Sequence, residues 1–174
     1  MSTTTIEDQL GEIRRRIVRL QERAQAGAPR TWRHLDALHQ EEAAVRVAVR
    51  QAPDEVEEKL GQLMTRLDVA EHSLEADDAS DDWAIFVAAV ESELHSWDTY
   101  LERLQTSVVA KAWRAREQAE AAIGDVRSRR IAVGERLAQV RDSDGAVSQK
   151  ARRRITAARD ELEQKATELS TKLN

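Results

Sequence analysis

A seven-residue repeat of aliphatic side chains runs through most of this sequence and constrains the fold more than any other feature. In two stretches the apolar residues step alternately by four and three positions, the spacing that keeps them on one face of a helix. These residues are Ile6, Leu10, Ile13, Ile17, Leu20 and Ala24 in the first stretch, and Val56, Leu60, Leu63, Leu67, Ala70 and Leu74 in the second. The repeat predicts an all-α protein, an elongated antiparallel helical bundle or coiled coil.

The composition narrows the kind of core and the compartment. Aromatic residues make up 3% of the chain and charged residues 34%, so the core must be aliphatic and narrow. The charges are interleaved with the apolar positions, which favours exposed helix faces over disorder. The sequence contains no cysteine, and its first residues lack the basic start and apolar run of a signal peptide. We therefore expect a cytoplasmic protein for which a membrane is not a partner.

Prolines and capping residues predict where the first helices begin and end. The first helix should begin near Thr5 and end before Pro29, and Thr31 is a candidate N-cap for the second helix. Pro53 leaves two alternatives, because proline either starts a helix or kinks one. The chain could form one kinked helix over residues 31–76 or two separate helices.

The second half of the chain predicts one very long helix followed by a hairpin. An acidic stretch at residues 75–82 marks a break, and no proline or glycine pair interrupts the apolar seam that follows, so a single helix is predicted over about residues 82–141. Residues 142–145 supply a turn, and the last helix should pair back as a C-terminal helical hairpin.

Two domains follow from this layout. Residues 1–110 are predicted to form an N-terminal helical bundle that includes an acidic segment at 53–102, and residues 111–174 a basic antiparallel hairpin. The alternative is one continuous rod-like domain.

Charge is segregated along the chain. Residues 53–102 hold 15 acidic and two basic residues, a net charge of −13, whereas residues 103–159 hold 14 basic and six acidic residues, a net charge of +8. Opposite charge on different parts of a rod favours head-to-tail or antiparallel self-association, which salt would screen. We expect a homo-oligomer, most simply a dimer, or a complex with another helical protein.

The basic residues near the predicted hairpin turn are the main candidates for binding an acidic partner or nucleic acid. The set comprises Arg127, Arg129, Arg130, Arg136, Lys150, Arg152, Arg153, Arg154 and Arg159. Arginines gathered on a rigid surface can bind phosphates without reading sequence. Trp32 and Trp113 are candidate interface anchors, because they lie off the apolar seams. Trp83 and Trp97 share a heptad position with seam residues and are predicted in the core.

Motifs for catalysis are lacking in the sequence. It has no glycine-rich phosphate loop, no nucleophile elbow and no zinc-protease helix. Its four histidines lack the Glu-x-x-His spacing of carboxylate metal bundles, and we expect them to be isolated surface residues. We expect Glu42, which lies on an apolar seam, to sit at the edge of the seam or to pair with Arg14, Arg15 or Arg16. No catalytic, cofactor-binding or metal-binding residues are predicted.

The sequence therefore predicts a non-enzymatic helical scaffold or protein-interaction module that self-associates through heptad seams and opposed charge. The alternative is sequence-independent binding of nucleic acid, or of another acidic surface, by the arginine-rich hairpin tip.

Overall fold

The computed structural model describes residues 3–25, 29–79, 82–109, 113–141 and 148–173, and these residues form six α-helices. The helices are α1 (Thr3–Ala24), α2 (Pro29–Gln51), α3 (Val56–Asp78), α4 (Trp83–Val108), α5 (Trp113–Val140) and α6 (Ser148–Leu173), with a short 3-10 turn, η1 (Pro53–Glu55), before α3. The described residues contain no strand, and the prediction of an all-α bundle is confirmed.

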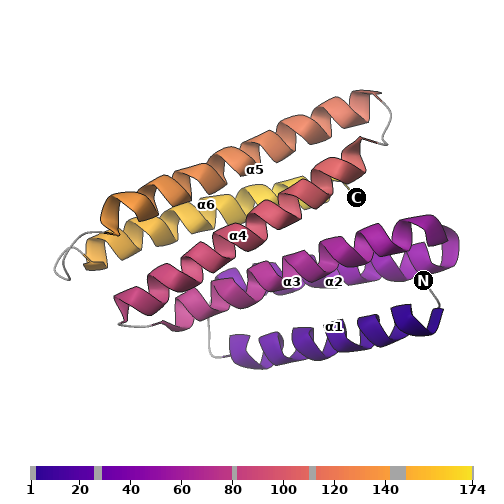
Figure 1. Cartoon of the computed structure of the whole chain (residues 1–174), viewed down its shortest axis with the longest axis horizontal. Helices are drawn as coiled ribbons and strands as arrows, with labels where there is room; N and C mark the ends of the chain where they lie inside the picture. The colour runs from indigo at the N-terminus through magenta and orange to yellow at the C-terminus, as the bar shows by residue number, and fades with distance from the viewer. Residues whose placement is uncertain (1–2, 26–28, 80–81, 110–112, 142–147, 174) are drawn as a thin grey trace.

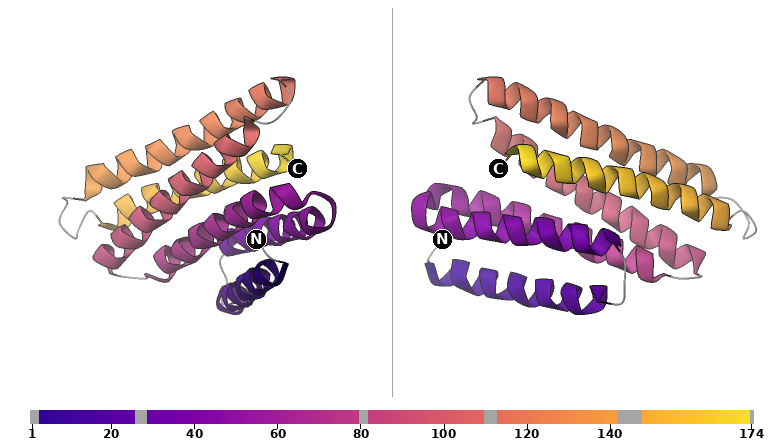
Figure 2. Two further views of the ribbon diagram at one scale, coloured as in Figure 1. Left: turned by 45° about the vertical axis from the view of Figure 1, so that its right-hand side comes forward. Right: turned by 180° about the vertical axis from the view of Figure 1, so that it is seen from behind.

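Successive helices are antiparallel and lie side by side (Figure 1). α1 is on one outer side, next to the pair α2 and α3. α4 and α6 follow, and α5 lies on the opposite outer side, as both further views show (Figure 2). The α2–α3 connection therefore lies at one end of the bundle, whereas the end of α5 and the start of α6 lie at the other.

The prediction of one helix over residues 82–141 was wrong. α4 ends at Val108, and α5 begins at Trp113 and packs back along α4. α5 is the longest helix in the described ranges, with 28 residues. In the last turn of α4 the hydroxyls of Thr106 and Ser107 donate hydrogen bonds to carbonyls of the preceding turn, which competes with regular helix. Folding back also buries two apolar seams against each other, which a single extended helix would leave exposed.

The chain forms two helices around Pro53, so the second of the two alternatives holds. Ala52 leaves the helical conformation, with φ −143° and ψ 71°, and the N–H of Glu55 donates a hydrogen bond to the Ala52 carbonyl at 3.0 Å. Proline fits the first position of such a turn because its missing N–H is not needed there. The N-cap predicted at Thr31 was wrong. Here too a proline starts the helix, since α2 already begins at Pro29.

The described residues bury two apolar clusters. One joins α1, α2 and α3 and includes Ile13, Leu38 and Leu63; the other joins α4, α5 and α6 to the later part of α3. Trp97 is fully buried in the second cluster, as predicted, and Trp83 packs against it as a partly buried side chain. α3 contributes to both clusters, so it connects the two halves of the bundle.

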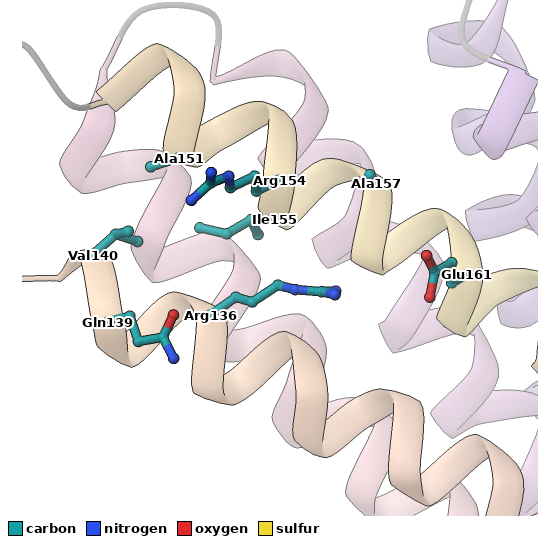
Figure 3. Close-up of a pocket in the computed structure, with 8 residues that line it drawn as sticks. All are labelled: Arg136, Gln139, Val140, Ala151, Arg154, Ile155, Ala157 and Glu161. Carbon is teal, nitrogen blue, oxygen red and sulfur yellow. The ribbon is translucent and has the colours of Figure 1, made fainter.

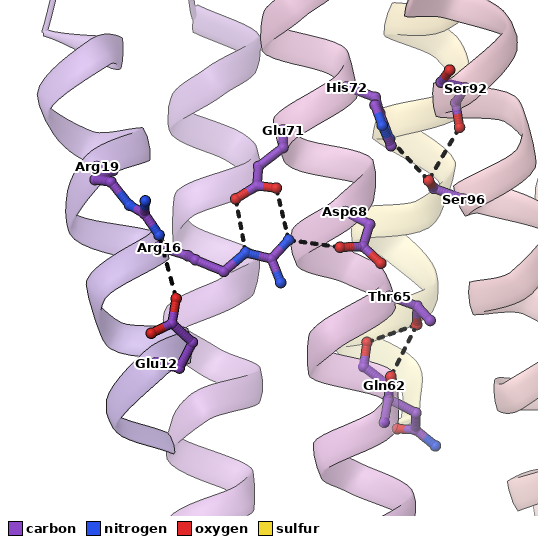
Figure 4. Close-up of polar contacts among 11 residues, drawn as sticks. Glu12, Arg16, Arg19, Gln62, Thr65, Asp68, Glu71, His72, Ser92 and Ser96 are labelled. Carbon is purple, nitrogen blue, oxygen red and sulfur yellow. Dashed lines mark hydrogen bonds and ion pairs between the residues drawn. The ribbon is translucent and has the colours of Figure 1, made fainter. Parts of the chain in front are cut away.

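Ion pairs attach α1 to α3 at the edge of the first cluster (Figure 4). Arg16 donates to Glu71 at 2.9 and 2.7 Å and to Asp68 at 2.6 Å. The hydrogen bonds that Arg16 donates to Glu71 outweigh burial and raise the pKa of Arg16 above its ordinary value. The prediction for Glu42 is confirmed, since it accepts a hydrogen bond from Arg14 at 2.7 Å.

Asp82 is the N-cap of α4, and replacing it tests whether its side chain stabilises the start of this helix. Its Oδ1 accepts a hydrogen bond from the backbone N–H of Ile85 at 3.1 Å. Asp82→Ala is expected to lower the free energy of unfolding by about 1 kcal/mol, because one helix N–H loses its acceptor. Urea denaturation followed by circular dichroism measures this loss. Asp82→Asn keeps an acceptor and should restore most of the stability; equal losses in both variants would contradict a capping role.

In the described part of the chain, none of the helices combines the length and the apolar character that crossing a bilayer requires.

Candidate functional site: two charged ends and a buried ionic layer

The predicted arginine set is divided by the structure, and Arg159 lies deepest. It is 1% exposed and sits between α3, α4 and α6. Its guanidinium donates to Glu93 at 2.7 Å, to Asp77 at 3.0 Å and to the Ser73 carbonyl at 3.0 Å. Burial alone would lower the pKa of Arg159, but Glu93 and Asp77 raise it, so the side chain stays charged. This arginine binds groups of its own chain and is not exposed to a partner.

Arg152 caps the end of α3. Its Nη2 donates to the carbonyls of Ala76 and Ala79, and its guanidinium lies 4.4 Å from the centre of the Phe86 ring. A cation at the carboxyl end of a helix binds carbonyls that lack helical partners and complements the helix dipole. Arg152 therefore joins α6 to the α3–α4 corner.

Three more members of the set, and the neighbouring Arg141, are also engaged within the chain. Their partners are Asp98 for Arg130, Glu161 for Arg129 at 2.8 Å, Gln105 for Arg127 at 2.8 Å and Glu91 for Arg141 at 3.2 Å. Part of the segregated charge is thus neutralised between the acidic segment and the basic hairpin of one molecule.

The remaining members, Arg136, Lys150, Arg153 and Arg154, form what we call the basic end. They lie at the end of α5 and the start of α6, and none of the described residues forms an ion pair or hydrogen bond with them. Arg136 and Arg154 line a groove of about 350 Å³ between the two helices, together with Val140 and Ala157. Figure 3 shows the Arg136 guanidinium directed toward Glu161 and that of Arg154 toward Ala151.

The opposite end of the bundle carries the acidic turn, which we define as Asp54, Glu55, Glu57 and Glu58. All four residues are exposed. Among the described residues their only basic partner is Lys59, whose Nζ lies 3.6 Å from Glu55. Figures 1 and 2 place this turn, at the start of α3, at the far end of the molecule from the basic end.

Between the two apolar clusters lies a second group of charges, the buried ionic layer: Arg66, Glu163, His34, Glu41 and Tyr100. Arg66 is 0% exposed and donates to Glu163 at 2.5 Å. The Nε2 of His34 lies 3.3 Å from the other oxygen of Glu163, and Tyr100 donates its hydroxyl hydrogen to Glu41 at 2.7 Å. The layer draws on α2, α3, α4 and α6, so it fixes how four helices align.

Several buried polar atoms of this layer have no hydrogen-bond partner among the described residues. They include Nε and Nη1 of Arg66 and Oε2 of Glu41, and the indole nitrogen of Trp97 beside the layer is in the same state. The Arg66 guanidinium lies 4.5 Å from the centre of the Trp97 ring, a cation–π contact that offsets part of its desolvation.

Burial perturbs the acids of the layer. It raises the pKa of Glu41 to about 7, although Arg66 and the Tyr100 hydroxyl act in the opposite direction. The pKa of Tyr100 is also raised, first by burial and then by Glu41. Perturbed acids of this kind occur in active sites; in this layer they lie between packed helices and bind side chains of the same chain.

Sequence reasoning missed the buried ionic layer. His34 is 1% exposed, so the expectation that every histidine lies at the surface was wrong. Arg66 and Glu163 each adjoin a seam leucine, Leu67 and Leu162, a position where a charge is usually solvated. Their burial follows from four helices meeting there, which a single-helix pattern does not reveal.

The two candidate tryptophans and His72 lie outside the charged ends and the buried ionic layer. Trp32 is 43% exposed, whereas the side chain of Trp113 lies outside the described residues. His72 shares a hydrogen bond of 3.1 Å with Ser96 (Figure 4). Across the described ranges, no group of three or more His, Asp or Glu side chains is placed to hold a metal ion.

Comparison of this chain with known protein families, with curated proteins and with solved structures gives no match.

Proposed function

We propose that this protein is a non-enzymatic helical scaffold whose copies associate through their oppositely charged ends. The basic end of one copy would bind the acidic turn of another. One observation carries the proposal: pairing within the chain engages much of the segregated charge, yet leaves an exposed cationic group at one end and an exposed anionic group at the other. Such groups attract each other between molecules, over a distance that salt shortens.

Two assemblies satisfy this pairing. Two antiparallel copies would make the contact twice and close a symmetric dimer, the commonest kind of homo-oligomer. Copies arranged head to tail would instead make an open chain or a ring. We favour the dimer, because it leaves neither charged end exposed, and we expect it to form in the cytoplasm.

Nucleic-acid binding has less support, because five of the nine predicted contact residues bind groups of the same chain. Sequence-independent affinity rises with the number of phosphates that are neutralised. The four residues of the basic end offer few such contacts, so this alternative enters as an outcome of the test below.

Charge reversal at each end tests the proposal. The basic-end variant carries Lys150→Glu, Arg153→Glu and Arg154→Glu; the acidic-turn variant carries Asp54→Lys, Glu57→Lys and Glu58→Lys. Each is expected to weaken self-association at least tenfold, about 1.4 kcal/mol, because its two ends now repel each other. Mixing the two variants in equal amounts should restore association, since each then supplies the charge that the other lacks. Light scattering on a sizing column measures the mass.

Both variants alter exposed positions, so we expect them to fold, and circular dichroism checks this. If the mixture stays monomeric while the unmodified chain associates, the ends are not the contact. If the unmodified chain is monomeric and only its binding to duplex DNA is lost in the basic-end variant, the nucleic-acid alternative replaces this proposal.

A further inference from the structure

The grooves of the bundle differ in the charge that they still offer. The groove along the outer face of α1 contains arginines, but Arg15 and Arg19 both pair with Glu12. In the groove between α1 and α4, Arg23 pairs with Asp78. By contrast, the groove between α5 and α6 has two arginines that pair with none of the described residues.

We infer that the groove between α5 and α6 is the docking site for the acidic turn of a second copy of this chain, with Arg136 and Arg154 binding its carboxylates. This inference rests on the proposed self-association and adds the surface through which the two copies would bind. It separates the basic end into two arginines that hold the partner and two cations, Lys150 and Arg153, that lie outside the groove.

The composition of the groove suits this occupant. Arginine guanidinium groups bind carboxylates with two parallel hydrogen bonds, which fixes direction as well as adding affinity. Val140 and Ala157 add apolar surface beside the arginines. The acidic turn matches both features, because its four carboxylates follow the exposed ring of Pro53.

The one carboxylate of the groove does not neutralise it. Glu161 lies at its far end and pairs with Arg129 at 2.8 Å. The guanidinium groups of Arg136 and Arg154 therefore remain available to carboxylates from another molecule.

Two double variants with equal charge loss test the groove. Arg136→Gln with Arg154→Gln removes both cations of the groove, whereas Lys150→Gln with Arg153→Gln removes two cations of the same end outside it. The groove variant should raise the Kd of self-association at least tenfold, measured by analytical ultracentrifugation at low salt. The control should change Kd about threefold or less, because rim charges mainly steer the encounter.

Docking in the groove and association through the charged ends can fail separately. Equal weakening by both variants would overturn the groove as the docking site, while leaving association through charged ends intact. No weakening by either variant would overturn both claims.

Cross-linking gives an independent measurement, because the chain has no cysteine of its own. A Gln51→Cys copy, changed next to the acidic turn, is mixed with a Gln139→Cys copy, changed in the groove, and treated with a short bismaleimide. We expect a cross-linked heterodimer whose yield falls in 1 M salt. A Val18→Cys copy is the control, since Val18 lies on the exposed face of α1. Equal yields with Gln139→Cys and Val18→Cys would contradict docking in the groove.

Discussion

Replacing Arg66 by methionine is expected to lower the free energy of unfolding by about 3–5 kcal/mol, the usual cost of removing one partner of a buried ion pair. The variant leaves Glu163 without its 2.5 Å contact in the interior of the bundle. It also removes the cation over the Trp97 ring. Since small domains are stable by only about 5–15 kcal/mol, the loss should be evident in thermal and urea unfolding.

The physical cause can be separated from simple loss of packing. Adding Glu163→Gln to Arg66→Met removes the orphaned charge and should recover most of the lost stability. Arg129→Met breaks an exposed pair with Glu161 and should cost no more than about 1 kcal/mol. If the double variant is as unstable as Arg66→Met alone, the cost does not come from an uncompensated charge.

Replacing Glu41 by glutamine is expected to remove a pH dependence of stability. The pKa of Glu41 is raised from its ordinary 4.5 to about 7 in the folded chain. Between these values the folded state binds more protons than the unfolded state, so Glu41 makes stability fall as the pH rises from about 4.5 to 7. The shift corresponds to about 3 kcal/mol. Glu41→Gln should match the unmodified chain at pH 4.5 and exceed it at pH 8, as measured by urea unfolding at each pH.

The neighbouring Glu42 provides a control with the opposite sign. Burial acts to raise its pKa, but the hydrogen bonds from Arg14 and Arg46 outweigh burial and lower it. Glu42 therefore stabilises the folded chain at pH values above the pKa that Glu42 has in the unfolded chain. This stabilisation is lost as the pH falls through its lower pKa in the folded chain. Glu42→Gln should reduce stability at pH 8. A Glu41→Gln variant that is less stable at pH 8 than the unmodified chain would contradict the account of the buried ionic layer.

The buried ionic layer has a structural advantage that apolar residues, which would avoid its desolvation cost, do not offer. Buried polar groups can fix the register of helices whose apolar seams are nearly interchangeable. In this chain the seams are built from similar aliphatic residues, so Leu63 or Leu67 alone would tolerate a slip by one heptad. The pairing of Arg66 with Glu163 would be lost by such a slip.

The sequence predicted the helices better than their arrangement. The apolar repeat identified helix faces such as Ile13 and Ile17 in α1, because burial of one face depends on the period of a single segment. It did not reveal the reversal after Val108, because the sequence there has no proline or glycine and the reversal is stabilised by packing of α5 on α4. Long-range burial also explains why Arg66 and His34 were not anticipated.

The sequence likewise predicted where charge is concentrated, but not which charged side chains remain exposed. The count of acidic and basic residues identified segregated segments, and this is a property of the sequence itself. Which arginines remain exposed depends on partners distant in the chain, such as Glu93 and Asp77 for Arg159. The groove formed by Arg136 and Arg154 likewise needs two helices and could not be read from either one.

Light scattering of the unmodified chain at 50 mM and 1 M salt tests self-association through the charged ends most directly. We expect a mass above that of a single chain at low salt, falling toward the single-chain mass at high salt, where the Debye length is about 3 Å. A single-chain mass under both conditions, or an oligomer that salt does not dissociate, would contradict it.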